Sequence, residues 1–389
     1  MASIGTAVAS LRTSEQHSKV KSIPLGRAAI IVFFISLLLR ALLIGILSLL
    51  GLLGSTNPII ATISAPFNLL NGLNFLVAIP AALAIYVWAQ RTEEASIFLE
   101  TMNNLLRNRS AIGGVVLIGI LLIAGDFAPA IATHDPILSM IGQPGETGRL
   151  PAKPPCIPAF GCTDTLHLMG LDLNARDLFS RLVFGAQTSL RVGIASVMFS
   201  IIIGSTLGLI SGYAGSWTDN LIMRFMDVLL AFPSLLLAIT IVTIKGPGIE
   251  NALLAIAIVS IPVYARLIRA SVLAVKEYEF VTAERALGAS AIRIIFAQIL
   301  PNTLTPLIVQ GALGIGGAVL ETASLSFLGL GAQPPLPEWG QMLSEGRNYV
   351  FTAPHLVFFP GLAIMLTVLG FNLLGDGLRD ALDPRLNRN

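Results

Sequence analysis

Residues able to catalyse covalent chemistry or to hold a metal ion are scarce in this sequence. Its 389 residues include four histidines and two cysteines, and they do not have the spacing of a standard metal site. The sequence also lacks G-x-x-x-x-G-K-[ST], the loop that binds nucleotide phosphates. We therefore expect no catalytic residue, metal or cofactor on this chain. Any ATP that drives it would be bound by another chain.

The two cysteines form one candidate pair. Cys156 and Cys162 lie close together in a Pro-containing segment. If that segment lies outside the cell, its surroundings are oxidising enough for a disulfide. A disulfide that closes a small loop is the first interpretation and free thiols are the second. A metal site is the third, because no histidine lies next to the cysteines.

Charged residues inside apolar segments are the other candidates. Asp227 and Glu321 each lie inside or near the end of such a segment, and a charge within a membrane marks a substrate or ion path by default. We expect these two residues to face a translocation path, or else to be paired with other charges within the bundle. Asp126 lies near the outer end of its segment, where exposure at the membrane interface accounts for it.

Membrane-spanning helices would position these side chains. Hydrophobic residues make up 54% of the chain and charged residues 12%, against about 25% charged in soluble domains. Apolar runs of about 20 residues, the length that spans a bilayer, recur along the chain. We predict an all-α membrane protein with about eight spans, at residues 28–53, 69–89, 112–131, 192–213, 221–242, 252–272, 304–327 and 356–374. The net charge of +2 gives no reason to expect a nucleic-acid partner.

The placement of Lys and Arg predicts the orientation of these spans, because such residues are more frequent in cytoplasmic segments. With the amino terminus inside, most of the Lys and Arg residues between the spans fall on the cytoplasmic side. The outer side then holds only Arg149, Lys153, Arg176, Arg181, Lys245 and Arg347. We therefore expect both termini in the cytoplasm.

This orientation places a long loop, residues 132–188, on the outer side. Residues 142–155 are rich in Pro and Gly, and residues 177–190 are amphipathic, with Leu178, Val183 and Leu190 among polar residues. One interpretation is a helix lying on the membrane surface. The other, with equal weight, is an outer rim that meets a partner delivering substrate.

Residues 276–301 form a cytoplasmic loop with the pattern of two short helices. Phe280, Ala283 and Leu287 recur at helical spacing and predict one apolar stripe over residues 276–288. Gly288 suits the left-handed position after a helix. Ser290 suits the N-cap of a second helix, which Pro301 would stop. From this pattern alone, an amphipathic connector is favoured over a functional element.

The same segment resembles the EAA loop of ABC-importer permeases, through residues 281–290 and the Leu-Pro pair at residues 300–301. In that family the loop is a coupling helix that sits in a groove on the ATPase subunit. This chain departs from the family pattern at Thr282, which replaces the leading Glu, and at Glu284, which replaces the second Ala. The resemblance implies an ATPase-coupling loop that contains Glu279, Ala283, Glu284, Arg285, Gly288, Ala289, Leu300 and Pro301.

Further motifs resemble peptide-type permeases of the DppC and OppC kind. Residues 167–181 read HLMGLDLNARDLFSR, similar to H-x-x-G-T-D-x-x-G-R-D-x-x-S-R in that family. Leu171 replaces the Thr and Ala175 replaces the second Gly. Residues 224–233, 324–331, 339–347 and 375–385 are similar to the family as well. The resemblance runs from about residue 106 to the carboxyl terminus.

The resemblance implies the transmembrane domain of a type I ABC importer, with six core helices and two added spans before them. We expect an amino-terminal extension at residues 1–104, and the first core helix with the outer loop at residues 105–186. The permease core follows at residues 187–378, and a cytoplasmic tail at residues 379–389. For the extension, a lipid-facing brace is favoured over a regulatory or partner-binding role.

The implied function is that of a permease subunit that imports di- or oligopeptides across a bacterial or archaeal cytoplasmic membrane. Its implied partners are a second, DppB- or OppB-like permease, two ATPase subunits that hold ATP and Mg²⁺, an extracytoplasmic substrate-binding protein and membrane lipid. Nickel or opines are alternative substrates, because related permeases share these signatures. A secondary transporter driven by an ion gradient is less favoured, because the sequence shows no inverted repeat.

Overall fold

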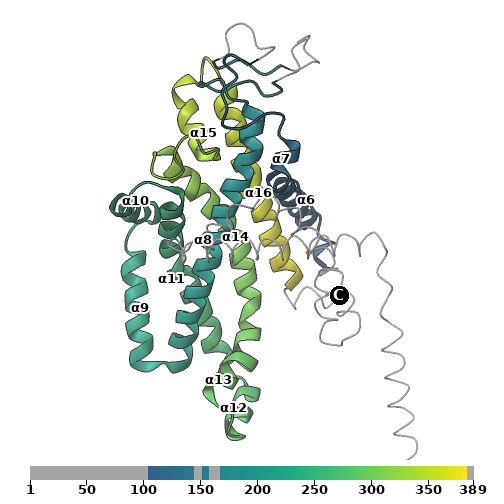
Figure 1. The fold of residues 1–389 in the computed structure, drawn as a ribbon. Coiled ribbons are helices and arrows are strands. Elements are labelled where there is room, and N and C mark those ends of the chain that lie inside the picture. The colour runs from purple at the N-terminus through teal and green to yellow at the C-terminus, as the bar shows by residue number, and fades with distance from the viewer. Residues whose placement is uncertain (1–103, 144–150, 157–166, 383–389) are drawn as a thin grey trace, which may run out of the picture.

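Figure 1 shows the chain as a computed structural model, which describes residues 104–143, 151–156 and 167–382. Over these residues every named element is helical, and extended pairing is limited to an isolated bridge between Leu171 and Asp177. The all-α fold expected from the sequence is therefore confirmed. The expected spans at residues 28–53 and 69–89 lie outside the described residues, as does Cys162.

Five helices are long and apolar enough to cross a membrane, and a bent pair supplies a sixth span if it is taken as one. The five are α6 (Arg109–Asp126), α8 (Leu178–Ala214), α11 (Ile249–Val275), α14 (Leu300–Phe327) and α16 (His355–Leu382). This matches the six-helix core that the sequence predicts. The short helix α7 (Ala128–Ile131) follows α6 directly.

The span expected at residues 221–242 is broken in the middle. The structure has two helices there, α9 (Ser216–Leu230) and α10 (Ser234–Lys245), which meet at an angle of 89°. Pro233 lies at the break, since proline has no N–H to donate and forces the residue before it out of the helical region. Pro262, by contrast, lies inside α11 without breaking it.

The separate surface helix considered for residues 177–190 is wrong. These residues are the first turns of α8, which continues without a break for 37 residues. Leu178, Val183 and Leu190 are buried, and so is Arg181. The amphipathic pattern arises because this part of α8 packs against protein on its apolar side and pairs its charges internally. Helix α8 also crosses the boundary expected between residues 186 and 187.

Helices α8 and α11 lie side by side through a row of glycines. Gly204, Gly208 and Gly212 recur every four residues on α8 and so share one face. A Cβ added at Gly208 would come within 2.5 Å of the carbonyl oxygen of Ala265 on α11. Small residues at this spacing allow the backbones of two membrane helices to approach closely. These glycines hold the backbone of α8 directly against α11.

Two regions of irregular structure lie at opposite ends of the bundle (Figure 1). One end carries residues 276–301, with α12 (Glu279–Ala286), α13 (Ala291–Arg293) and the π-helix η2 (Ile294–Ile299). The other end carries the described residues of 128–177, together with α15 (Trp339–Gly346) and the 3₁₀ turn η3 (Arg347–Tyr349). We call these regions the 276–301 segment and the cap.

Candidate functional site

The 276–301 segment folds as two helices joined by a tight turn, as the sequence predicts. Gly288 has a φ of 81°, the left-handed conformation that glycine adopts without strain. The N–H of Gly288 donates to the carbonyl of Arg285, and the N–H of Ala289 donates to that of Glu284, both at 3.0 Å. This pair of bonds is the Schellman motif that ends a helix. The Ser290 hydroxyl then accepts from the N–H of Arg293 and caps the second helix.

Helix α12 begins at Glu279, three residues after the predicted start. Val281 is its buried residue and faces the bundle. The predicted stripe of Phe280, Ala283 and Leu287 is exposed instead, and Leu287 leaves 84% of its surface accessible. The amphipathic pattern therefore identifies a face that this chain alone does not cover.

More apolar side chains of the 276–301 segment are exposed. Ile292 and Phe296 leave 70% and 62% of their surfaces accessible, and Tyr278 packs edge-on against Phe280 with ring centroids 5.6 Å apart. Together we call these side chains the exposed apolar set: Tyr278, Phe280, Leu287, Ile292 and Phe296. Several large apolar side chains exposed in one short segment mark an interaction surface.

The second helix does not stop at Pro301, contrary to the sequence-based prediction. The chain stays helical from Ala291 to Phe327 and passes through η2 just before the proline. The N–H of Leu300 bonds the carbonyl of Ile295, five residues back. The wider turn accommodates a proline that has no N–H to donate. Leu300 is partly buried and Pro301 is exposed, so this end of α14 is continuous with the 276–301 segment.

Arg285 and Lys276 join the segment to the bundle, and a third contact lies inside the segment. Gln298 donates to the carboxylate of Glu284 at 3.2 Å, which ties α12 to η2. The guanidinium of Arg285 lies 5.5 Å from the ring centroid of Tyr213, at the end of α8. Lys276 donates to the carbonyl of Gly212. Glu284 and Arg285 therefore have intramolecular partners.

A second connection beside these contacts was not predicted from the sequence. Arg269 on α11 donates two hydrogen bonds of 2.5 Å to the carboxylate of Asp219 on α9. Ser211 on α8 donates to the same carboxylate. Such a two-bond arginine–carboxylate pair is directional. The Asp219 carboxylate thereby connects the ends of α8, α9 and α11. The sequence carries no motif for this contact, because its three residues lie on separate helices.

The two predicted pathway residues are both partnered. Asp227 on α9 forms an ion pair of 2.5 Å with Arg266 on α11, and the two side chains are 56% and 51% exposed. Glu321 on α14 hydrogen-bonds Ser234, the first residue of α10. The structure does not bring Asp227 and Glu321 together in one direct contact. Each instead marks a junction between the broken span and a continuous helix.

In the cap, a buried network of charges joins distant parts of the chain. Arg176 donates to Asp172 at 2.6 Å and to Glu345 at 2.9 Å. Arg181 is fully buried and lies 3.4 Å from both carboxylates. It also donates to the carbonyls of Pro136 and Pro335. Residues 172–181 resemble the family motif, but that motif does not predict that Glu345 is their partner.

Another buried carboxylate organises helix α15 of the cap. Glu338 is the N-cap of α15, and it accepts from the N–H of Gln341 at 2.9 Å and from the hydroxyl of Ser189 at 3.0 Å. Burial raises the pKa of the Glu338 carboxyl, while these hydrogen bonds act in the opposite direction. The side chain of Trp339 packs beside it and donates to the carbonyl of Leu182. Helix α15 is thereby fixed to α8.

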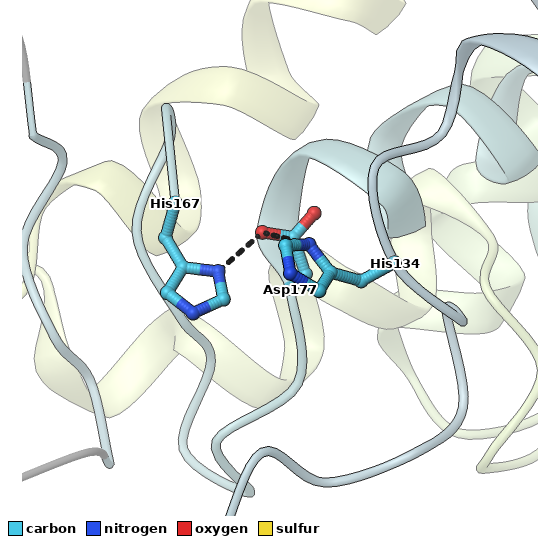
Figure 2. A group of neighbouring side chains, drawn as sticks. All are labelled: His134, His167 and Asp177. Atoms are coloured by element: carbon cyan, nitrogen blue, oxygen red, sulfur yellow. Dashed lines mark hydrogen bonds and ion pairs between the residues drawn. The ribbon is translucent and has the colours of Figure 1, made fainter. Parts of the chain in front are cut away.

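The cap also brings together residues that could hold a metal ion, which sequence spacing did not suggest. His134, His167 and Asp177 lie together, with their donor atoms all within 4.8 Å of one another (Figure 2). They are separated by too many residues to form a recognisable metal motif. In the same cap Cys156 is buried and disulfide-bonded.

Comparison with known proteins gives consistent matches. The family "binding-protein-dependent transport system inner membrane component" matches residues 204–388. The dipeptide transport system permease protein DppC of Alkalihalophilus pseudofirmus is 48% identical over 287 residues, covering 74% of this chain and 90% of the relative. The di/tripeptide permease DppC of Pseudomonas aeruginosa is 46% identical over 288 residues, covering 74% and 92%. The glutathione permease GsiD of Pectobacterium atrosepticum is 52% identical over 220 residues, covering 57% and 73%.

These matches agree with the helical core and with the sequence motifs. The relatives are named as permease proteins of transport systems, so the family's role is transport, and ATP hydrolysis lies in partner subunits. The matched family consists of inner-membrane components, as the apolar helices also indicate. The chain therefore belongs to the inner-membrane permeases of binding-protein-dependent ABC importers, in the DppC-like branch.

Proposed function

We propose that this chain is one permease subunit of an importer that carries short peptides across the cytoplasmic membrane. The relatives are named for dipeptides, di- and tripeptides and glutathione, which are all short peptides. This favours peptides over nickel or opines as the cargo. It also argues against an ion-driven secondary transporter, because the relatives belong to binding-protein-dependent systems.

The exposed apolar set of the 276–301 segment carries the proposal. Leu287 and Ile292 lie on the two sides of the turn at Gly288, and both are largely exposed. Helices α12 and α13, which this turn joins, lie at one end of the bundle (Figure 1). A surface of this kind is stabilised when a partner covers it. We assign that partner as an ATPase subunit, which binds ATP and Mg²⁺ inside the cell. Both termini of the permease would then be cytoplasmic.

The contacts behind this surface would carry movement into the bundle. A push on α12 would reach α8 through Arg285 and Tyr213, and would reach η2 and α14 through Glu284 and Gln298. The Asp219–Arg269 pair would keep α8, α9 and α11 moving as one body. The ATPase would thereby bias the bundle between inward-open and outward-open states.

The substrate path would lie along the face of α9 and α11 that carries Asp227 and Arg266. A half-exposed ion pair on membrane helices is costly in lipid, so a second permease subunit or a water-filled path would cover it. Glu321, which hydrogen-bonds Ser234 at the start of α10, would border the same path. A Cys substituted at Asp227 should react with a water-soluble thiol reagent during transport. Reaction only with lipid-soluble reagents would contradict this placement.

At the opposite end, the cap would meet the extracytoplasmic substrate-binding protein. We propose that Cys156 and Cys162 form a disulfide there, as the sequence suggests. Thiol labelling of the denatured, unreduced chain should then find no free cysteine. Two labelled thiols would exclude the pairing. The amino-terminal extension, residues 1–104, would add two spans beside the core as a lipid-facing brace.

Gly288→Val tests the coupling assignment. A Cβ at Gly288 would meet nothing within 4 Å, so the substitution strains only the left-handed backbone, by about 1–2 kcal/mol. Peptide uptake and transport-stimulated ATPase activity should fall together in the assembled complex, while membrane insertion persists. Unchanged ATP-driven uptake would overturn the assignment.

Gly142→Val is the matched control. Gly142 also has a φ of 81° and nothing within 4 Å of an added Cβ, but it lies in the cap. The backbone strain is therefore the same at the opposite end of the bundle. This variant should retain coupled ATPase activity. An equal loss in both variants would mean that local strain, and not the position of the turn, decides the outcome.

A further inference from the structure

The His134, His167 and Asp177 cluster draws on three separate segments of the cap. His134 follows α7, His167 lies in the loop before α8, and Asp177 is the N-cap of α8. Figure 2 shows both imidazole rings turned toward the same carboxylate. Two imidazoles and one carboxylate form a donor set that suits Zn²⁺. We propose that these three residues bind a zinc ion that fastens the loop of the cap to the end of α8.

Two of the separations among the donor atoms are close to those of a zinc site. Nδ1 of His167 lies 2.9 Å from Oδ1 of Asp177, and Nδ1 of His134 lies 3.8 Å from the same oxygen. Two ligands of a tetrahedral zinc ion lie about 3.3 Å apart, given zinc–ligand bonds of about 2.0–2.1 Å. One separation is therefore slightly shorter than this value and the other slightly longer. The three donor atoms lie within 4.8 Å of one another, so the ring nitrogens would move inward by up to about 1.5 Å to surround one ion.

The surroundings orient the carboxylate for such a role. Oδ2 of Asp177 accepts from the N–H of Ser180 at 2.8 Å and from the hydroxyl of Thr133 at 3.3 Å. These bonds hold the carboxylate plane and leave Oδ1 turned toward the two rings. Outer contacts of this kind usually orient the ligands of metal sites. The nearby guanidiniums of Arg176 and Arg181 pair with Asp172 and Glu345, so Asp177 supplies the negative charge at the rings.

Burial leaves one side of the cluster accessible. Asp177 and His167 are buried, whereas the side chain of His134 is 25% exposed. A water molecule entering beside His134 would supply a fourth ligand. Ion binding would replace the hydrogen bond of 3.0 Å between Nδ1 of His134 and the Thr133 hydroxyl. The ion would cross-link His134 to Asp177, which lies 43 residues later in the sequence.

The competing arrangement is a cluster held by protons alone. In it, Nδ1 of His167 donates to Asp177 and His134 stacks at 4.8 Å between ring centroids. Acid pH weakens zinc binding, because the imidazoles must be neutral to act as ligands. The two arrangements therefore differ in a measurable way. Only the zinc-bound arrangement retains a zinc ion and loses stability when the ion is removed.

Metal binding by the full chain in lipid nanodiscs tests the proposal. Chelator-treated protein is incubated with ZnCl₂, desalted, and analysed for zinc content and thermal unfolding. The wild-type chain should retain one more zinc ion than His134→Gln, and zinc should raise its Tm. X-ray absorption should give nitrogen and oxygen ligands at about 2.0–2.1 Å. His134→Gln leaves the Asp177 cap intact, so its Tm without zinc should stay near the wild-type value.

His355→Gln is the matched control, because His355 is another buried histidine at the same end and lies near the carbonyl of Leu171. This variant should retain zinc like the wild type. Equal zinc content and an equal Tm response in the wild type and in His134→Gln would overturn the proposal and leave the proton-held cluster. Neither readout depends on peptide transport, so the result is independent of the proposed function.

Discussion

The cap and the 276–301 segment differ in which side chains they bury and which they expose. In the cap, Arg181, Asp177 and Glu338 are fully buried, and all three have partners within the chain. In the 276–301 segment, Leu287 and Ile292 are largely exposed to solvent. The charges of the cap are paired inside the chain. The 276–301 segment has an apolar surface that still needs a partner.

This difference indicates where each region obtains its stability. A buried charge stabilises the fold only while its partners are present, and the loss of one partner is costly. An exposed apolar side chain contributes little to the fold, but it contributes to binding when a partner removes it from water. Substitutions in the cap should therefore change unfolding, and substitutions in the exposed apolar set should change coupling.

Arg181→Met should give the largest effect. The substitution leaves Asp172 and Glu345 with one fewer cation in a buried site and frees the carbonyls of Pro136 and Pro335. We expect a loss of about 3 kcal/mol in the free energy of unfolding, at the lower end of the range for broken buried pairs because Arg176 still contacts both carboxylates. Thermal and denaturant unfolding in detergent would measure it.

The control is Arg266→Met, which breaks the half-exposed pair with Asp227. Exposed pairs contribute at most about 1 kcal/mol, so this variant should unfold close to the wild type. If Arg181→Met lost no more stability than Arg266→Met, the cap would not depend on its internal pairs, and the contrast between the two regions would be lost.

Leu287→Asp should have the next largest effect, and on function alone. A charge at a side chain that is 84% exposed costs the isolated chain little. At a covered apolar interface, it should weaken ATPase docking by at least about tenfold, equivalent to about 1.4 kcal/mol. Pull-down of the ATPase subunits and peptide uptake would both fall, while the Tm of the permease stays unchanged.

Leu138→Asp is the corresponding control in the cap, because Leu138 is also exposed. It should leave ATPase docking intact. A fall in the Tm of Leu287→Asp would mean that Leu287 supports the fold of this chain. Intact docking in that variant would remove Leu287 from the interface.

The two regions also differ in how far their sequences predict them. The turn at Gly288 and Ser290 is determined locally by one left-handed glycine and one N-cap, so the sequence predicted it correctly. The charge network of Arg181, and the His134–His167–Asp177 cluster, depend on residues that only the folded chain brings together. The spacing of these residues in the sequence therefore does not predict either contact.

The positions of the helix breaks are also not predictable from the sequence alone. Of the prolines Pro233, Pro262 and Pro301, only Pro233 lies at a break between helices. At Pro301 the π-helical turn before it accommodates the missing N–H. At Pro262 the helix continues against the glycine row of α8. Neighbouring helices thus decide whether a proline breaks a span, and a single sequence does not contain that information.

A comparison of two strained residues should show the smallest effect. Ala175 in the cap and Ser216 at the start of α9 have φ values of 56° and 49°. Replacing such a residue with glycine relieves about 1–2 kcal/mol of strain but adds about 0.4–1 kcal/mol of backbone entropy to the unfolded chain. Ser216 is exposed, so Ser216→Gly should stabilise the fold by about 0.5–1 kcal/mol.

Ala175→Gly should differ because its methyl group is fully buried with Leu171 and Met140. Losing one buried carbon costs about 0.8 kcal/mol, which offsets the relief of strain, so the change in Tm should be close to zero. This offset explains how the cap tolerates alanine where the family motif has glycine. A clear gain for Ala175→Gly, equal to that of Ser216→Gly, would mean that the methyl group adds nothing to the packing of the cap.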